Sequence, residues 1–163
     1  MVKRYNQLLV ACYVVSDMFL ASWAFLLAYL IRFESGLVPV TKGFPPLDQY
    51  LNVLPFVAVL TPLAYQLQGV YRLRRGRSRI DDFFAVLIGS ILAVVLGIVT
   101  TLYVQTYYAS EASRATGAYE VSQLVWLLFL GLNVVLTSLS RETIREVLER
   151  RWRAGIGLKR ILI

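Results

Sequence analysis

Four long apolar runs constrain the fold of this chain more than any other feature. They cover residues 8–31, 50–67, 83–103 and 121–139, and Asp17 is the single charged residue within them. A transmembrane helix needs about 20 predominantly apolar residues, because an α-helix rises about 1.5 Å per residue and the hydrocarbon core is about 30 Å thick. The sequence therefore predicts an all-α membrane protein, with a four-transmembrane-helix bundle over residues 1–140.

Composition argues against an ordinary soluble domain. Apolar residues make up 58% of the chain, whereas soluble domains contain about 45–50%. The formal net charge of +7 does not indicate a nucleic-acid surface, because the basic residues flank the apolar runs. The chain has one cysteine, Cys12, and no histidine, which excludes an intramolecular disulfide and imidazole chemistry in this segment.

The distribution of positive charge predicts the orientation of the bundle. Fourteen of the 17 lysines and arginines lie before the first run, in residues 72–79 or after residue 140. Positive residues are retained on the cytoplasmic side of a membrane. We therefore expect both termini and the central loop to be cytoplasmic, with two short loops on the other side.

The segment after the fourth run predicts a helix that leaves the membrane. Residues 141–157 read as an amphipathic juxtamembrane helix followed by a linker, because apolar residues recur at helical spacing until glycines interrupt them. Residues 158–163 are typical of a buried strand, which would be the first strand of a truncated Rossmann-like α/β domain. A lone strand is not stable in water, so we expect the natural protein to continue beyond it.

Asp17 is the first candidate for a functional residue. An ionisable group inside a membrane span is costly to bury and is expected to have a partner. Counting inward from the cytoplasmic ends of the spans places three polar residues at the depth of Asp17. The predicted polar layer consists of Asp17, Thr61, Ser90 and Asn133. Such a layer would either lock the helix packing or form part of a proton or substrate path.

The central loop is the densest basic element of the chain. Its positive charges are all arginines, which bind phosphate groups in a bidentate manner. The loop either docks anionic lipid headgroups or a polyprenyl phosphate, or only enforces the orientation of the spans. The candidate phosphate-binding residues are Arg72, Arg74, Arg75, Arg77 and Arg79.

Several short motifs together resemble one bacterial family. The chain resembles the N-terminal membrane region of the large polyprenyl-phosphate sugar phosphotransferases, the phosphoglycosyltransferases that begin exopolysaccharide or O-antigen synthesis. The resemblance covers essentially the whole chain, although its motifs are short. The matching segments are Ala28-Tyr29-Leu30-Ile31-Arg32-Phe33, Gly69-Val70-Tyr71-Arg72, Arg75-Gly76-Arg77-Ser78 before Asp81-Asp82, and residues 158–163.

This resemblance implies a function for the parent protein rather than for this segment. The family transfers a sugar 1-phosphate from a nucleotide sugar to undecaprenyl phosphate in the bacterial inner membrane. The chemistry uses Mg²⁺ and an Asp-Glu pair in a C-terminal domain, and no residue of this chain matches that pair. The resemblance thus implies a membrane-anchoring segment without catalytic or metal-binding residues. Its partners would be membrane lipids, a polyprenyl phosphate and a second copy in a homodimer, but no nucleic acid.

Two other interpretations remain open from the sequence. The membrane region of nucleotide-sugar 4,6-dehydratases is similar in having four spans and a Tyr-Arg motif at the start of the central loop. The Arg75-Gly76-Arg77-Ser78 run favours the transferase. A complete four-span accessory protein that helps to move lipid-linked sugars across the bilayer is the third interpretation, and the apparent strand at residues 158–163 argues against it.

Overall fold

The computed structural model describes residues 2–36, 45–71, 78–115 and 119–153. Within these ranges the chain forms helices joined by turns, and no strand is present. The predicted linker and strand, residues 154–163, lie outside the described residues. The elements are α1 (Val2–Phe33), α2 (Leu47–Leu67), α3 (Arg79–Tyr103), a π-helical turn (Val104–Tyr108), α4 (Glu111–Ala115) and α5 (Gln123–Arg153).

Four of these helices are long and apolar enough to cross a membrane. The candidate spans are Val10–Phe33, Leu47–Leu67, Arg79–Tyr108 and Gln123–Val147. The four-span prediction is confirmed at the level of helix length and composition. The helices extend past the predicted apolar runs because hydrophobicity marks only the segment in hydrocarbon, whereas backbone hydrogen bonding continues a helix into polar surroundings.

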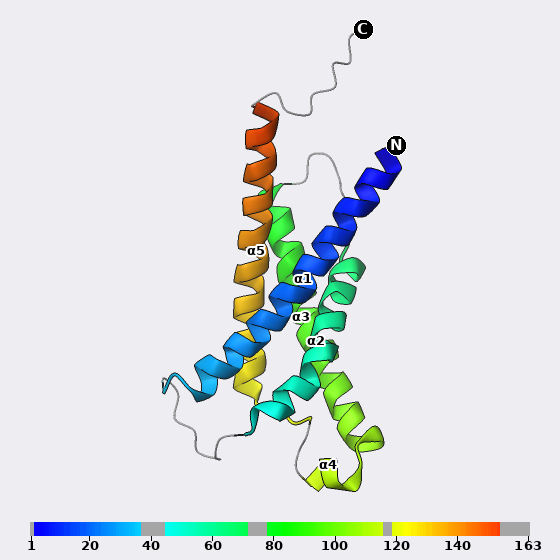
Figure 1. Cartoon of the computed structure of the whole chain (residues 1–163), viewed down its shortest axis with the longest axis vertical. Helices are drawn as coiled ribbons and strands as arrows, with labels where there is room; N and C mark the ends of the chain where they lie inside the picture. Colours follow the sequence, from blue (N-terminus) through cyan, green and yellow to red (C-terminus); the bar gives the residue numbers. More distant parts are fainter. Residues whose placement is uncertain (1, 37–44, 72–77, 116–118, 154–163) are drawn as a thin grey trace.

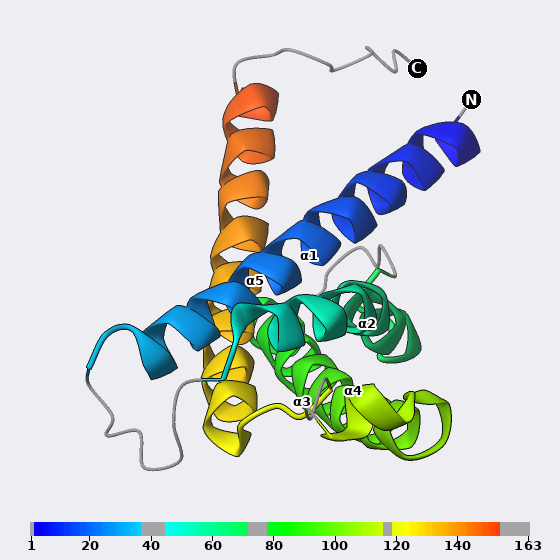
Figure 2. The same cartoon turned by 60° about the horizontal axis from the view of Figure 1, so that its bottom comes forward.

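The four long helices form a closed ring in which α1 packs on α2 and α5, and α3 packs on α2 and α5. Figure 1 places the start of α1 and the end of α5 at the same end of the bundle, together with the end of α2 and the start of α3. We call this end the terminal end, and the opposite end, where α4 lies, the α4 end. Helices α1 and α5 cross and then diverge toward the terminal end, as Figures 1 and 2 both show.

Local signals account for the turn region between α2 and α3. Gly69 adopts a φ of 68°, a left-handed conformation that glycine reaches without a Cβ clash. The chain then folds back on α2, because the Val70 amide donates to the Tyr65 carbonyl at 3.0 Å. Helix α3 begins after Ser78, whose Oγ accepts from the Ile80 amide, and two aspartates in its first turn suit the positive end of the helix dipole.

Two apolar clusters fill the ring. The larger cluster, which we call the aromatic cluster, lies toward the α4 end and joins α1, α2 and α5. The smaller cluster, which we call the terminal cluster, lies toward the terminal end and joins α1, α2, α3 and the turn after α2. The buried members of the aromatic cluster include Phe25, Tyr29, Tyr50, Trp126 and Phe129, and those of the terminal cluster are Tyr65, Val70, Tyr71 and Val86.

Glycines on α3 let aromatic rings from neighbouring helices lie against the helix backbone. A Cβ atom built on Gly97 would lie 2.7 Å from Cη2 of Trp126, and one on Gly89 would lie 2.5 Å from Cδ1 of Tyr65. Small residues commonly mark helix contacts in membranes, because association there depends on close packing rather than on hydrophobic burial. A Cβ on Gly131 of α5 would meet nothing within 4 Å.

Replacing Gly97 with alanine is expected to destabilise the bundle by about 1–3 kcal/mol, because the new methyl overlaps a ring that is already packed. Trp126 cannot retreat freely, since its ring contacts Phe25 at a centroid distance of 5.4 Å. Equilibrium unfolding in mixed micelles measures the change, and Gly131→Ala is the matched control. Equal unfolding free energies for the two variants would contradict this account of α3.

Candidate functional site

The principal polar feature of the bundle is an ion pair between α1 and α5. Arg141 Nη2 lies 2.8 Å from Asp17 Oδ2, and the Asp17 residue is only 2% exposed. The Tyr71 hydroxyl donates to the same carboxylate oxygen, also at 2.8 Å. Asp17 therefore joins α1 to α5 and to the turn that follows α2. We call this trio, Asp17, Tyr71 and Arg141, the latch.

The ion pair of the latch lies inside the apolar spans rather than at their ends. Asp17 is seven residues from Val10 and Arg141 is six residues from Val147, which are the terminal-end limits of their candidate spans. At about 1.5 Å per residue, both side chains start about 10 Å inside the spans. Their equal depths explain how a residue near the start of α1 meets a residue far along the antiparallel α5. Opposite charges so placed satisfy each other where water is scarce.

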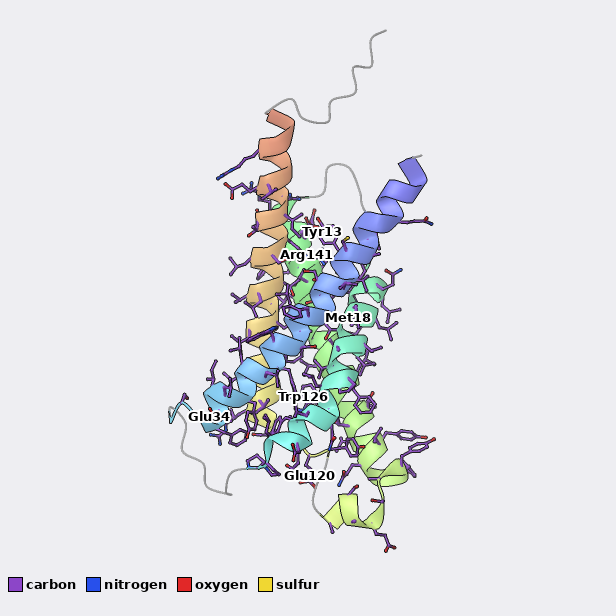
Figure 3. All side chains as sticks on the ribbon, in the orientation of Figure 1. Tyr13, Met18, Glu34, Glu120, Trp126 and Arg141 are labelled. Atoms are coloured by element: carbon purple, nitrogen blue, oxygen red, sulfur yellow. The ribbon has the colours of Figure 1, made fainter. Side chains whose placement is uncertain are left out.

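Three tyrosine rings surround the guanidinium group of Arg141. Its Cζ atom lies 5.4 Å from the ring centroid of Tyr13, 5.7 Å from that of Tyr71 and 6.0 Å from that of Tyr65. Ring faces attract a cation, and the attraction is strongest where water is excluded. Figure 3 shows Tyr13 and Arg141 close together in the terminal half of the bundle. The cation is thus held by one carboxylate and by aromatic faces.

Tyr71 keeps its proton in this setting. Burial, together with the negative charge of Asp17, raises the pKa of the Tyr71 hydroxyl. A protonated hydroxyl donates a hydrogen bond, which is the form that the Asp17 carboxylate requires. Tyr71 therefore acts as a fixed donor that ties the α2–α3 connection to α1.

A second polar group lies deeper in the bundle and joins α2, α3 and α5. The amide nitrogen Nδ2 of Asn133 donates to the Tyr65 hydroxyl at 2.9 Å and to Ser90 Oγ at 3.1 Å. The hydroxyls of Tyr65 and Ser90 are 2.9 Å apart, and Thr137 Oγ1 lies 3.4 Å from the Tyr65 hydroxyl. All four residues are buried. We call them the hydroxyl cluster.

The predicted polar layer is thus divided in the structure. Ser90 and Asn133 are brought together in the hydroxyl cluster, whereas Asp17 belongs to the latch. The hydroxyl of Thr61 donates to the Val57 carbonyl of its own helix at 2.8 Å, a bond that satisfies a buried threonine without a second helix. The latch and the hydroxyl cluster adjoin at Tyr65, whose ring faces Arg141 and whose hydroxyl binds Asn133.

Sequence reasoning missed the partners of Asp17. Arg141 follows the fourth apolar run and was assigned to the cytoplasmic flank, because a positive charge after an apolar segment usually marks its end. Tyr65 lies in the second apolar run and Tyr71 in the Gly69-Val70-Tyr71-Arg72 motif, and neither was assigned a role inside the bundle. A signal was present on α5, where Asn133, Thr137 and Arg141 recur every four residues and so share one helix face.

The aromatic cluster closes the bundle toward the α4 end. Phe25 is fully buried, and its ring lies 5.4 Å from Trp126 and 5.7 Å from Phe129 between ring centroids. Figure 3 shows Trp126 in the lower half of the view, nearer the α4 end than Arg141. In the described residues the latch and the hydroxyl cluster therefore reach from the terminal end to Asn133, and packed rings lie beyond them.

Charged side chains at the terminal end form a second, more exposed set of ion pairs. Arg145 Nη2 lies 3.0 Å from Asp82 Oδ2 and joins α5 to α3. Arg79 Nε lies 3.8 Å from Glu142 Oε2 across the same two helices, and Glu142 also lies 3.7 Å from Arg145. We call these four residues, Arg79, Asp82, Glu142 and Arg145, the collar.

Of the predicted phosphate-binding arginines, Arg79 is the one that the structure describes. Its side chain is 70% exposed and lies beside Glu142. Arg72, Arg74, Arg75 and Arg77 lie outside the described residues.

Removing the Tyr65 hydroxyl is expected to destabilise the bundle by about 1–2 kcal/mol, because Asn133 then loses one of its two acceptors. Tyr65→Phe retains the ring that faces Arg141, so the latch should be unaffected. Equilibrium unfolding of Tyr65→Phe, compared with Tyr103→Phe at an exposed ring, measures the loss. No difference between these two variants would show that the hydroxyl cluster contributes nothing measurable.

Metal ligands are not gathered in the described part of the chain, where no group of three or more His, Cys, Asp or Glu side chains could hold a metal ion. Comparisons with known proteins add no relative, since no family model, curated protein or solved structure matches this chain.

Proposed function

We propose that this chain is the membrane-anchoring domain of a bacterial sugar-phosphate transferase. The parent enzyme would transfer a sugar 1-phosphate from a nucleotide sugar to undecaprenyl phosphate and release a nucleoside monophosphate. In this proposal the bundle carries no catalytic residue. It holds the cytoplasmic part of the enzyme beside the membrane, where the lipid acceptor lies.

The continuity of α5 is the observation that carries the proposal. The helix runs from Gln123 to Arg153 without a break, and 31 residues extend about 46 Å. The hydrocarbon core takes up about 30 Å of this length. About three turns therefore lie outside the hydrocarbon core, and the red end of α5 projects past the other helices in Figure 1. A domain that follows this helix would be held away from the bundle by it.

The closed core supports an anchoring role over transport. A proton or substrate path needs polar groups or water along its whole length. In the described residues the hydrogen-bonded polar groups that join helices reach Asn133. Thr61 and Thr101 are buried beyond it but donate to carbonyls of their own helices, and packed aromatic rings lie between the helices at that depth. The latch and the hydroxyl cluster therefore fit a role in holding the helices together.

Charge at the terminal end supports its cytoplasmic assignment. The start of α1 and the end of α5 lie at the same end of the bundle, and most lysines and arginines of the sequence flank that end. Positive residues favour the cytoplasmic side, where anionic headgroups also attract them. The arginines of residues 72–79 would then face the leaflet that contains the phosphate of the lipid acceptor.

An assay of the natural protein that contains this chain tests the proposal. Membranes with the full-length protein are incubated with undecaprenyl phosphate, Mg²⁺ and a panel of radiolabelled nucleotide sugars. We expect label to enter the lipid fraction from one of them, with release of a nucleoside monophosphate. Membranes with residues 1–163 alone should give no labelled lipid.

Two outcomes would contradict the proposal. Conversion of the nucleotide sugar to a 4-keto sugar would identify a dehydratase instead. A natural gene product that ends near Ile163 and gives neither product would identify an accessory protein of lipid-linked sugar transport.

A further inference from the structure

The last turns of α5 within the bundle are held differently from the rest of the helix. Toward the α4 end, Val125, Trp126 and Phe129 are buried in the aromatic cluster against α1 and α2. Toward the terminal end, the terminal cluster contains residues of α1, α2, α3 and the turn after α2. Among the described residues, none of α5 belongs to that cluster. Apolar packing therefore fixes α5 toward the α4 end, and other contacts must fix it toward the terminal end, where it leaves the bundle.

Polar contacts supply this attachment from two sides. Arg141 joins α5 to Asp17 of α1, and one turn later Arg145 joins α5 to Asp82 of α3. The same stretch of α5 lies where α1 and α5 diverge, as Figure 2 shows. Here α5 meets the terminal cluster through the guanidinium group of Arg141, which faces the rings of three tyrosines. The angle between the projecting parts of α1 and α5 thus depends on a few charged residues of α5 and on their partners.

The Asp17–Arg141 pair is much more buried than the ion pairs of the collar. The side chains of Arg141 and Asp17 are 19% and 3% exposed, those of Arg145 and Asp82 are 32% and 34% exposed, and those of Arg79 and Glu142 are 70% and 48% exposed. Exposed pairs are screened by water and salt and contribute little. A buried pair acts in a low dielectric, and breaking it leaves an uncompensated charge.

We propose that the Asp17–Arg141 pair is a conformational latch that sets the direction in which α5 leaves the bundle, and that the collar does not set it. When the latch is closed, α5 projects in one direction relative to α1. When it is open, the segment beyond Arg141 samples several directions while the aromatic cluster keeps the lower bundle assembled. The proposal concerns the projecting helix itself and does not depend on which domain follows it.

Distance measurements between α1 and α5 test the latch. Cys12 is the single cysteine of the chain, and it is exposed on α1. Val147→Cys adds a second label at an exposed α5 position that takes part in no ion pair described above. Double electron–electron resonance on the spin-labelled protein in lipid nanodiscs should give one narrow distance distribution, because the closed latch allows one direction.

Asp17→Asn and Asp82→Asn form the matched pair of variants. Asp17→Asn removes the charge that Arg141 requires but retains an oxygen that can accept from Tyr71. We expect a second distance between the two labels, with a population of about 10% or more. This population is typical of a two-state equilibrium in which the open state has become less unfavourable. Asp82→Asn breaks the less exposed of the two interhelical pairs of the collar, Arg145–Asp82, and should leave the narrow distribution unchanged.

A double variant separates the latch from any general loss of folding. Asp17→Asn combined with Arg141→Gln leaves no unpaired charge in the membrane, so it should remain assembled and monodisperse in detergent. It still lacks the ion pair and should show the same broadened distribution as Asp17→Asn. A narrow, wild-type distribution in the double variant would overturn the proposal, as would equal broadening by Asp82→Asn.

Discussion

Replacing Asp17 with leucine is expected to lower the free energy of unfolding by about 3–5 kcal/mol, because Arg141 is left as an uncompensated charge inside the bundle. Asp17 also accepts from the Tyr71 hydroxyl, which loses its acceptor. Asp17→Asn leaves the same charge uncompensated but retains an oxygen that can accept from Tyr71 and Arg141, so it should cost about 1–2 kcal/mol less than Asp17→Leu. Equilibrium unfolding in mixed micelles, followed by helical circular dichroism, measures both values.

A double-mutant cycle shows whether the loss arises from the pair. Asp17→Leu and Arg141→Leu should each be strongly destabilising, since each leaves one buried charge. The double leucine variant has no buried charge, so it should recover much of the stability lost in either single variant. Additive losses in the cycle would show that the two side chains do not act together.

Replacing Phe25 with alanine is expected to destabilise the bundle by about 3 kcal/mol, because the fully buried ring is the centre of the aromatic cluster. Its ring contacts those of Tyr50, Trp126 and Phe129, which belong to two other helices. Lipid cannot fill a hole inside the bundle, so the lost contacts are not replaced. The unfolding assay used for Asp17 measures the change.

Phe19→Ala is the matched control for this prediction. Phe19 lies on the same helix but is 63% exposed, in a position that faces lipid in a membrane. Its removal should change the unfolding free energy by less than about 0.5 kcal/mol. If Phe25→Ala were no more harmful than Phe19→Ala, the aromatic cluster would not be the main contact that closes the bundle.

Much of the architecture could be predicted from the sequence, because lipid imposes a simple requirement. A segment in hydrocarbon must satisfy its backbone hydrogen bonds internally, so an apolar run of sufficient length reads as a helix. The runs at residues 8–31 and 83–103 correspond closely to the cores of α1 and α3. The point at which the fourth span ends was harder to predict, because α5 continues through Arg141 and Arg145 without a change in backbone structure.

The composition of the polar core was harder to predict. Asp17 stood out, because it is the single charge within the apolar runs, but depth alone did not identify its partners. The charges around Arg141 mark its segment as cytoplasmic, but its backbone lies six residues inside the candidate span that ends at Val147. Tyr65 and Tyr71 contribute through hydroxyl groups whose direction depends on tertiary packing.

The most direct test of the central claim is a measurement of membrane topology. The claim is that four spans place the start of α1 and the end of α5 in the cytoplasm and α4 outside. Single cysteines at Glu111 and Arg150, in a Cys12→Ser background, are treated with a membrane-impermeant maleimide in intact spheroplasts. Glu111→Cys should be labelled at once, and Arg150→Cys should be labelled only after the membrane is permeabilised. Labelling of Arg150→Cys in intact spheroplasts would contradict the account.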